Sequence, residues 1–390
     1  MNPSDLYIKA LSLPPDMKQE VLLLSHKMLI LGFTASFEKV TEGPILRIYY
    51  FKPHSHATLG KIMSKEEDLA IAVGRESILI RRELDLVAIS VPREPRQIIS
   101  FQKTMHEFML SPKAQEAELP MIIGRTASGE LLWADLAKQP HILIGGATNS
   151  GKSIFVSQVI CSLALMKPPS ELRMSVVDTK QLDLTLFREL KHVRDVITDV
   201  NELRVFMQDT LALIRRRLQD MSGVARNIME WNALTLEQMP YICIIIDELA
   251  DVLDQDNMIL AAFPKGQRPE SIGMLLKRIA QISRAAGVHL IAATQRPSVD
   301  VIKGDTKTNF PSRIAFKLPT MQDSRVILDE NGAERLLGMG DMLCKLAGVD
   351  TPIRAHSAFV TMRDILQITG QHEMIREQYT LMSKQLRISN

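Results

Sequence analysis

The chain has 390 residues, of which 46% are hydrophobic and 24% are charged, so it is long and apolar enough to bury a sizeable core. Its formal net charge of +2 excludes a globally basic nucleic-acid-binding protein, and any DNA contact must therefore come from a local patch. Cys161, Cys243 and Cys344 lie far apart within apolar stretches, which argues against a disulfide framework and indicates buried thiols of a reducing compartment.

The beginning of the chain predicts a small α+β module over residues 1–115. It lacks the basic-then-apolar layout of a signal peptide, and the run 153–166 is short for a membrane span, so we expect a cytoplasmic protein without a membrane span. Hydrophobic spacing predicts helices at 16–31, 65–73 and 94–110. Strands are expected at 34–40, 45–51, 77–82 and 86–91, with the polar stretch 111–120 as the domain boundary.

Residues 116–390 predict a larger α/β domain with a mainly parallel central sheet and a helical tail. Short apolar runs alternate with helical segments, which is typical of βαβ units. The runs lie at 141–144, 174–177, 241–246, 288–293 and 313–318, followed by an antiparallel pair at 342–346 and 353–360. Residues 201–221 predict a long helix ending in three arginines, which we interpret as a solvated face. Residues 254–273 are expected to form a surface insertion, and 363–390 a polar helical tail.

The stretch 146–153 reads Gly-Ala-Thr-Asn-Ser-Gly-Lys-Ser and fits the phosphate-binding loop of P-loop nucleoside triphosphatases. An apolar strand precedes it and an apolar helix follows it, as this loop requires; a chance glycine turn is the alternative. Backbone N–H groups would face the phosphates, the lysine would neutralise them, and the serine hydroxyl would bind Mg²⁺. The predicted ATP-binding residues are Gly146, Ala147, Thr148, Asn149, Ser150, Gly151, Lys152, Ser153 and Ile154.

Two further strand ends carry polar residues suited to triphosphate hydrolysis. The run 241–246 ends on Asp247 and Glu248, the Walker B pattern, in which the first carboxylate helps to hold Mg²⁺ and the second polarises the attacking water. A strand that merely ends on acidic residues is the alternative. Gln295 follows the strand 288–293 and is expected to hydrogen-bond the γ-phosphate or the water, unless it is an ordinary loop residue.

Basic residues near the last of these strands suggest two other roles. Arg284 lies on the turn before it and is either a surface residue or, in a ring of identical subunits, a residue that reaches a neighbour's γ-phosphate. Arg296, Lys303 and Lys307 lie in a loop-rich basic segment and are candidates for DNA phosphate contacts, against the alternative of a solvated loop with local ion pairs.

Several runs together resemble the FtsK/SpoIIIE family of double-stranded DNA translocases, within the FtsK–HerA superfamily of P-loop ATPases. The resemblance is dense from residue 141 to residue 360. The matching runs are 245–251 (Ile-Ile-Asp-Glu-Leu-Ala-Asp), 283–290 (Ser-Arg-Ala-Ala-Gly-Val-His-Leu), 293–302, 309–317, 323–329 and 340–343 (Gly-Asp-Met-Leu). Residues 20–110 resemble the small α module of this family, best at 87–94.

The resemblance implies a RecA-like motor domain, a homo-hexameric ring around duplex DNA, and ATP hydrolysis between subunits with Arg284 acting in trans. Two departures stand out: residues 178–180 read Asp-Thr-Lys where the family usually has Asp-Pro-Lys, and Met321 stands where a second trans-acting lysine is expected. The alternatives are a DNA-packaging or conjugation-type pump, a secretion-type ATPase that moves polypeptide, and an inactive scaffold. The intact Lys152, Asp247 and Glu248 argue against the scaffold.

Overall fold

The computed structural model describes residues 8–54, 61–62, 64–298 and 304–370, and it divides the chain into two compact units. The smaller unit comprises residues up to Ile98 together with Arg125–Glu130, and the larger unit comprises Ile99–Gly124 and the chain from Leu131 onward. The division therefore falls at Ile98 and not within 111–120 as expected. The physical reason is that the helix at 101–110 buries Phe101, Met105 and Phe108 in the larger unit, where the Phe108 ring lies 5.8 Å from the Trp133 ring.

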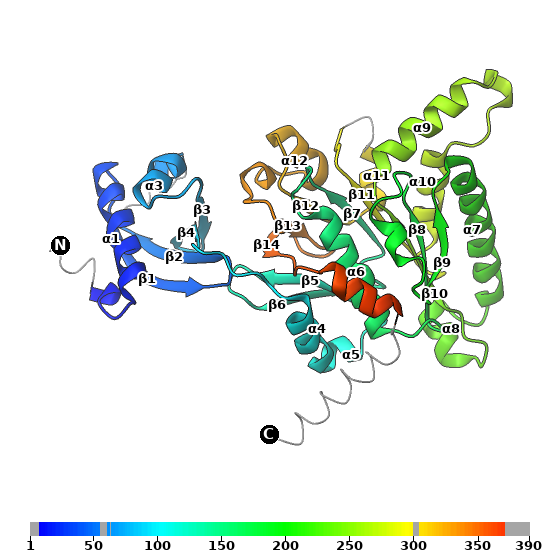
Figure 1. Ribbon diagram of the computed structural model, residues 1–390, viewed down its shortest axis with the longest axis horizontal. Coiled ribbons are helices and arrows are strands. Elements are labelled where there is room, and N and C mark those ends of the chain that lie inside the picture. Colours follow the sequence, from blue (N-terminus) through cyan, green and yellow to red (C-terminus); the bar gives the residue numbers. More distant parts are fainter. Residues whose placement is uncertain (1–7, 55–60, 63, 299–303, 371–390) are drawn as a thin grey trace. The chain divides into compact units, whose positions relative to one another are not determined.

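The smaller unit is an antiparallel four-stranded sheet with two helices beside it (Figure 1), which confirms the predicted α+β elements. Its strand order is β1-β2-β4-β3, and apolar side chains of both helices and all four strands form one core. The elements are η2 (Ile8–Ala10), α1 (Pro15–Ile30), β1 (Ala35–Glu42), β2 (Leu46–Pro53), α3 (Glu66–Ala72), β3 (Leu79–Glu83) and β4 (Leu86–Pro92).

The helix expected at 94–110 begins later than the sequence suggested. Pro95 interrupts the helical pattern, and the amides of Arg93 and Gln97 donate to backbone carbonyls at residues 45 and 44, so this stretch continues away from β4 without forming a helix. The helix α4 (Phe101–Leu110) starts after Ser100, whose hydroxyl accepts from the amide of Lys103, and α5 (Pro112–Gln115) follows.

The larger unit contains a ten-stranded sheet with the order β6-β5-β14-β13-β12-β7-β11-β10-β8-β9. The strands are β5 (Pro120–Thr126), β6 (Leu131–Asp135), β7 (His141–Gly145), β8 (Leu172–Val177), β9 (Val193–Ile197), β10 (Tyr241–Ile246), β11 (Val288–Thr294), β12 (Ser312–Phe316), β13 (Asp341–Lys345) and β14 (Ile353–His356). From β12 to β9 the neighbouring strands are parallel, and β13 and β14 are antiparallel, as predicted. The strands β5, β6 and β9 were not predicted, because charged residues or the assumed domain boundary obscured them.

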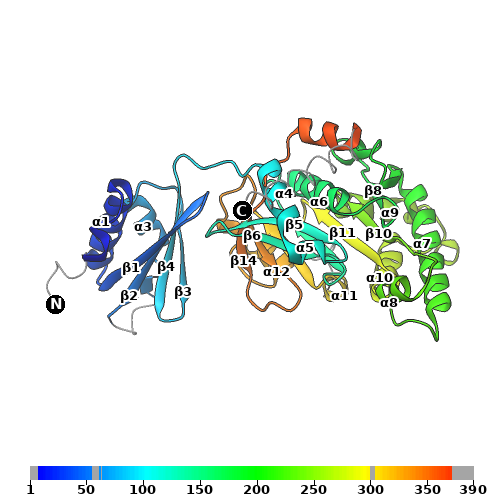
Figure 2. The ribbon, with the colours of Figure 1, turned by 90° about the horizontal axis from the view of Figure 1, so that it is seen from below.

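Helices cover both faces of this sheet, as buried parallel strands require. On one face, α7 (Val200–Met221), α9 (Leu249–Ala261), α10 (Ile272–Ile282) and α12 (Met321–Leu328) share one core with alternate strand residues. On the other face lies α6 (Lys152–Met166), whose Phe155 ring is 5.4 Å from the ring of Phe316. Figure 2 shows α4 beside α6. Further helical segments are η4 (Leu184–Phe187), α8 (Ile228–Leu234), η5 (Lys265–Gln267), α11 (Gly304–Asn309) and η6 (Ala333–Arg335).

The surface insertion expected at 254–273 is only partly correct. Its first half is the end of α9, where Asp256 is buried and its carboxylate accepts from Arg204 of α7 at 2.5 Å and from the amide of Ile272 at 2.8 Å. Only residues 261–268 are consistently exposed. Residues 362–370 are helical, as the tail was expected to be, and 371–390 lie outside the described residues. Among the described helices, none combines the length and apolarity needed to cross a membrane.

Candidate functional site

The predicted phosphate loop connects the carboxyl end of β7 to the first residue of α6, and its glycines are required by close contacts. Gly151 has a φ of +104°, and a Cβ atom there would lie 2.5 Å from the backbone nitrogen of Gly340. A Cβ atom on Gly146 would lie 2.6 Å from the Ser150 hydroxyl and 2.8 Å from Phe316 Cβ. Glycine is therefore dictated at both ends of the loop by space.

The loop carries polar groups suited to an anion. The N-cap residue of α6 is Gly151, which has no side chain to cap the first-turn amides, and the helix dipole adds partial positive charge there. The Ser150 hydroxyl is buried and has no hydrogen-bond partner among the described residues. A phosphate group would satisfy these donors, so the residues present fit the triphosphate of ATP.

Lys152 lies at the start of α6 with only 3% of its surface exposed, and its ammonium group bonds the Walker B residue. Lys152 Nζ donates to the Asp247 carbonyl at 2.7 Å and to Asp247 Oδ1 at 3.1 Å. Burial raises the pKa of Asp247, Lys152 opposes that shift, and the nearby carboxylates Asp183 and Asp178 add to it. Ser153 follows on the first turn of α6. One hydroxyl and one carboxylate suit Mg²⁺, which keeps several waters and takes its other ligands from the substrate phosphates.

Glu248 is buried, and both of its carboxylate oxygens accept hydrogen bonds from the end of β11. Thr294 Oγ1 donates to Glu248 Oε1 at 2.7 Å, and the Gln295 amide donates to Oε1 at 3.1 Å and to Oε2 at 3.0 Å. Lys180 Nζ lies 3.9 Å from Glu248 Oε2. The Gln295 side chain faces the phosphate loop, where its Oε1 accepts from the Thr148 hydroxyl at 3.0 Å.

The structure thus brings Lys152, Asp247, Glu248 and Gln295 together at the carboxyl edge of the sheet, although the sequence separates them widely. Sequence reasoning did not assign a role to Thr294 or Lys180. Thr294 precedes Gln295 at the end of β11, and a hydroxyl at that position indicates a polar contact in the site. Lys180 follows the end of β8, the strand next to β10, so it lies at the same edge of the sheet.

Arg284 lies elsewhere: it is exposed on the turn that precedes β11, whereas the phosphate loop follows the carboxyl end of β7. Because β7 and β11 are parallel neighbours, Arg284 is at the opposite edge of the sheet from its own subunit's loop. Buried groups hold this turn: His141 Nε2 lies 3.1 Å from the Ala280 carbonyl and 3.3 Å from Ser283 Oγ. Arg217 donates to the Ala286 carbonyl at 2.8 Å, so the expected solvated face of α7 is wrong for this arginine.

His141 and His289 predict acid sensitivity of the fold. Burial lowers the pKa of His141 to about 3 and of His289 to about 4, so both stay neutral in the folded protein well below pH 6.5, whereas the unfolded chain takes up protons there. We expect the free energy of unfolding to fall by about 2 kcal/mol per histidine between pH 7 and pH 5. Urea denaturation of wild type and His289→Gln at both pH values measures this, and an equal pH dependence in the two proteins would contradict the prediction.

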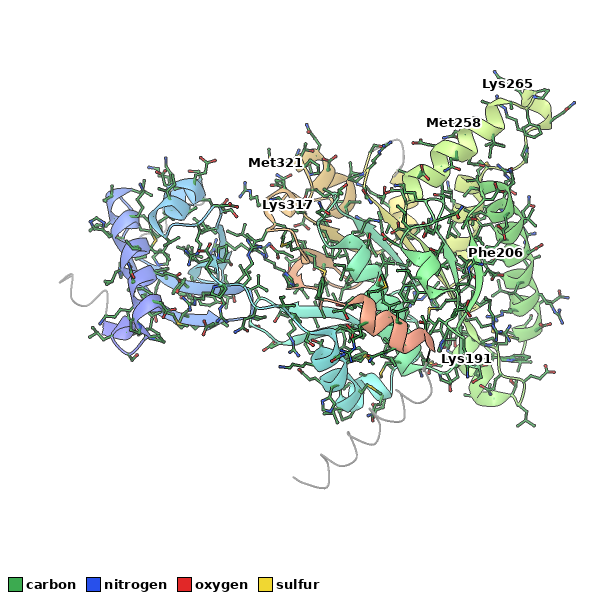
Figure 3. All side chains as sticks on the ribbon, viewed as in Figure 1. Lys191, Phe206, Met258, Lys265, Lys317 and Met321 are labelled. Carbon is green, nitrogen blue, oxygen red and sulfur yellow. The ribbon has the colours of Figure 1, made fainter. Side chains whose placement is uncertain are left out.

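The predicted DNA-contacting residues differ in availability. Arg296 is exposed, just beyond β11. Lys307 is partly buried, and its Nζ donates to Asp329 Oδ1 at 2.9 Å and to the Arg325 carbonyl at 3.1 Å, which matches the alternative of local ion pairs. Lys303 lies outside the described residues. Met321, at the start of α12, is 51% exposed (Figure 3).

The antiparallel strands β13 and β14 support the phosphate loop, which sequence reasoning missed. The Gly340 amide donates to the Ser150 carbonyl at 2.8 Å. Buried Asp341 receives a bidentate contact from Arg354, with distances of 3.1 and 2.7 Å, and this pair fixes the start of β13. The run 340–343, which resembles the family in sequence, thus contributes to the support of the phosphate loop.

The chain is similar to known proteins over most of its length. The model of the FtsK/SpoIIIE family matches residues 109–299. The protein "DNA translocase FtsK" of Chlamydia muridarum is 33% identical over 375 residues, which cover 92% of this chain and 46% of that relative. The protein of the same name from Halalkalibacterium halodurans is 37% identical over 352 residues, with coverages of 86% and 42%. The chain spans about half the length of the curated relatives it matches.

Solved structures share the fold. The pCW3 conjugation coupling protein TcpA, in its monomer form with ATPγS, has a TM-score of 0.60 at 23% identity over 89% of this chain and 98% of that one. The cytoplasmic domain of the Thermomonospora curvata type VII secretion ATPase EccC has a TM-score of 0.58 at 25% identity, with coverages of 69% and 34%. The larger unit therefore has a RecA-like P-loop ATPase fold. The match to the family model and the identities of 33% and 37% to its named members show that the chain belongs to the FtsK/SpoIIIE family.

Proposed function

We propose that this chain is the motor part of an ATP-hydrolysing machine that moves double-stranded DNA largely without regard to sequence, as a homo-hexameric ring. The convergence of Lys152, Asp247, Glu248 and Gln295 around the phosphate loop carries the ATPase half of this proposal. The DNA half is supported by the relatives named DNA translocase, to which the chain is 33 to 37% identical.

In this proposal each residue of the site has a defined task. Lys152 exchanges the Asp247 oxygens for phosphate oxygens when ATP enters the loop. Ser153 and Asp247 would hold Mg²⁺, which neutralises charge on the phosphates when bound. Glu248 polarises the attacking water, and Gln295 contacts the γ-phosphate or that water. The loop 146–153, all of which the structure describes, contains no arginine, and in this proposal Arg284 of a neighbouring subunit supplies one.

Contacts to DNA are assigned to the segment after β11. Arg296 is exposed there and is free to meet a backbone phosphate. Phosphate contacts carry no base information, which accounts for motion that is independent of sequence. Lys303 and Lys307 are weaker candidates, the second because it must first leave Asp329.

A polypeptide-moving ATPase is the second candidate, favoured by the 25% identity and TM-score of 0.58 to the secretion ATPase EccC. A conjugation-type or packaging DNA pump is a variant of the DNA-translocase proposal. The likeness to the conjugation coupling protein TcpA does not favour it, because that likeness supports only the shared fold. The higher identity of the chain to proteins named DNA translocase makes duplex DNA the preferred substrate.

The test is the steady-state ATPase rate with linear duplex DNA, with single-stranded DNA and without nucleic acid. We expect duplex DNA to raise the rate several-fold, equally for two unrelated duplexes of one length, and to lose this effect as salt increases. Lys152→Ala serves as the control for contaminating ATPases and should abolish all activity. A wild-type rate that duplex DNA leaves unchanged at low salt would overturn the DNA half of the proposal.

A further inference from the structure

The hydroxyl of Thr294 connects the Walker B glutamate to the backbone of Arg296. Thr294 is fully buried at the last position of β11. Its Oγ1 accepts from the Arg296 amide at 3.1 Å and donates to Glu248 Oε1 at 2.7 Å. A hydroxyl has a single proton, and the amide of Arg296 can only donate, so the direction of both hydrogen bonds is fixed.

These bonds orient the carboxylate of Glu248 toward β11. The Gln295 amide occupies both carboxylate oxygens as well, at 3.1 and 3.0 Å. A general base must direct a lone pair at the water it activates, and here protein donors already bond both oxygens of the carboxylate. Fewer lone pairs of Glu248 therefore remain for water in this orientation than in a carboxylate without these bonds.

The stretch 294–296 contacts the phosphate loop and also includes the residue assigned to DNA. On one side the Gln295 side chain accepts from Thr148 of the phosphate loop at 3.0 Å. On the other side Arg296, the exposed residue assigned to DNA, bonds the Thr294 hydroxyl through its own amide. The Thr294 hydroxyl is therefore bonded at once to the backbone of Arg296 and to Glu248.

We propose that Thr294 is a positioning residue that keeps Glu248 in this resting orientation until Arg296 is displaced by a duplex phosphate. Displacement removes the amide from Thr294 Oγ1 and loosens the hydroxyl. The carboxylate then keeps the longer hydrogen bonds from the Gln295 amide, at 3.1 and 3.0 Å, and turns toward water more easily. DNA stimulation of ATP hydrolysis then originates in this three-residue hydrogen-bond chain. The DNA trigger rests on the proposed function, whereas the resting orientation of Glu248 does not.

The test compares Thr294→Val with Thr294→Ser. Valine keeps the β-branch and volume but removes the hydroxyl, and serine keeps the hydroxyl. We expect Thr294→Val to raise the DNA-free kcat about tenfold, the effect of one hydrogen bond to a charged group, with little change in KM for ATP. The DNA-stimulated rate should stay within about twofold of wild type, because Glu248 is already released there. Thr294→Ser, which keeps the hydroxyl, should have the same low DNA-free rate as wild type.

The outcomes separate the two proposals. A Thr294→Val protein whose DNA-free rate equals that of wild type, or whose rates fall in parallel with and without DNA, overturns the positioning role. A raised DNA-free rate together with a wild type that DNA does not stimulate keeps the positioning role and overturns the translocase proposal. If Thr294→Val does not fold, Thr294→Cys provides the same comparison, because a thiol is only a weak donor.

Discussion

Replacing Glu248 with glutamine is expected to lower kcat for ATP by at least about 100-fold while nucleotide affinity stays within about threefold. Glutamine keeps a carbonyl oxygen that accepts from Thr294 and Gln295, so the fold and the loop remain intact. It loses the negative charge that polarises water. Steady-state ATPase assays and titration with a fluorescent ATP analogue measure the two quantities.

A matched control is Glu237→Gln, an exposed glutamate of the same unit, which should leave both quantities unchanged. Loss of nucleotide binding in Glu248→Gln would mean that the carboxylate supports the loop structurally. A kcat within about fivefold of wild type would assign water activation to another residue and remove Glu248 from the proposed mechanism.

The second large effect is expected at Arg284, although it lies at the far edge of the sheet from its own phosphate loop. Arg284→Ala should lower kcat about 1,000-fold, the lower range for a trans-acting arginine, and leave nucleotide binding intact. Arg216→Ala is the control, because Arg216 is an arginine with 81% of its side chain exposed on α7.

Mixing distinguishes a trans role from a structural one. Arg284→Ala subunits keep a complete loop, and Lys152→Ala subunits keep the arginine, so mixed rings contain competent interfaces. With equal amounts and random assembly, half of the subunits carry an intact phosphate loop. Half of those loops face a neighbour that carries Arg284, so about a quarter of wild-type activity is expected. If the activity of the mixture is no higher than the sum of the activities of the two variants measured separately, a trans-acting Arg284 is contradicted.

The sequence predicted those elements whose pattern is locally strong. The loop 146–153 lies between β7 and α6 as expected, because the glycine spacing and the flanking apolar runs are both local signals. Asp247 and Glu248 follow β10, and Gln295 follows β11, because residues at the carboxyl ends of parallel strands meet at one edge. The order of these strands in the sheet was not needed to predict their meeting.

Features that depend on tertiary contacts were not predictable. Half-exposed β9 carries Arg194 and Asp195 and has no clear apolar alternation. The sequence predicts that Arg217 is one of three solvated arginines. In the structure its guanidinium instead donates to two backbone carbonyls that are distant in sequence. The domain boundary was misplaced because the composition of 111–120 is loop-like, whereas the burial of Phe101, Met105 and Phe108 decides where the unit begins.

The contact between Gly151 and Gly340 limits how this protein can be divided or recombined. The family match ends at residue 299, before β12, β13 and β14. Yet Gly340, just before β13, supports the loop, and Phe316 of β12 packs against Gly146. A fragment ending at residue 299 would keep the phosphate loop, Asp247 and Glu248. It would lose Phe316 and Gly340, which pack against the two glycines of the loop. Chimaeras between relatives should therefore exchange residues 121–360 as one block, since a junction near residue 300 would combine a loop from one parent with a support from the other.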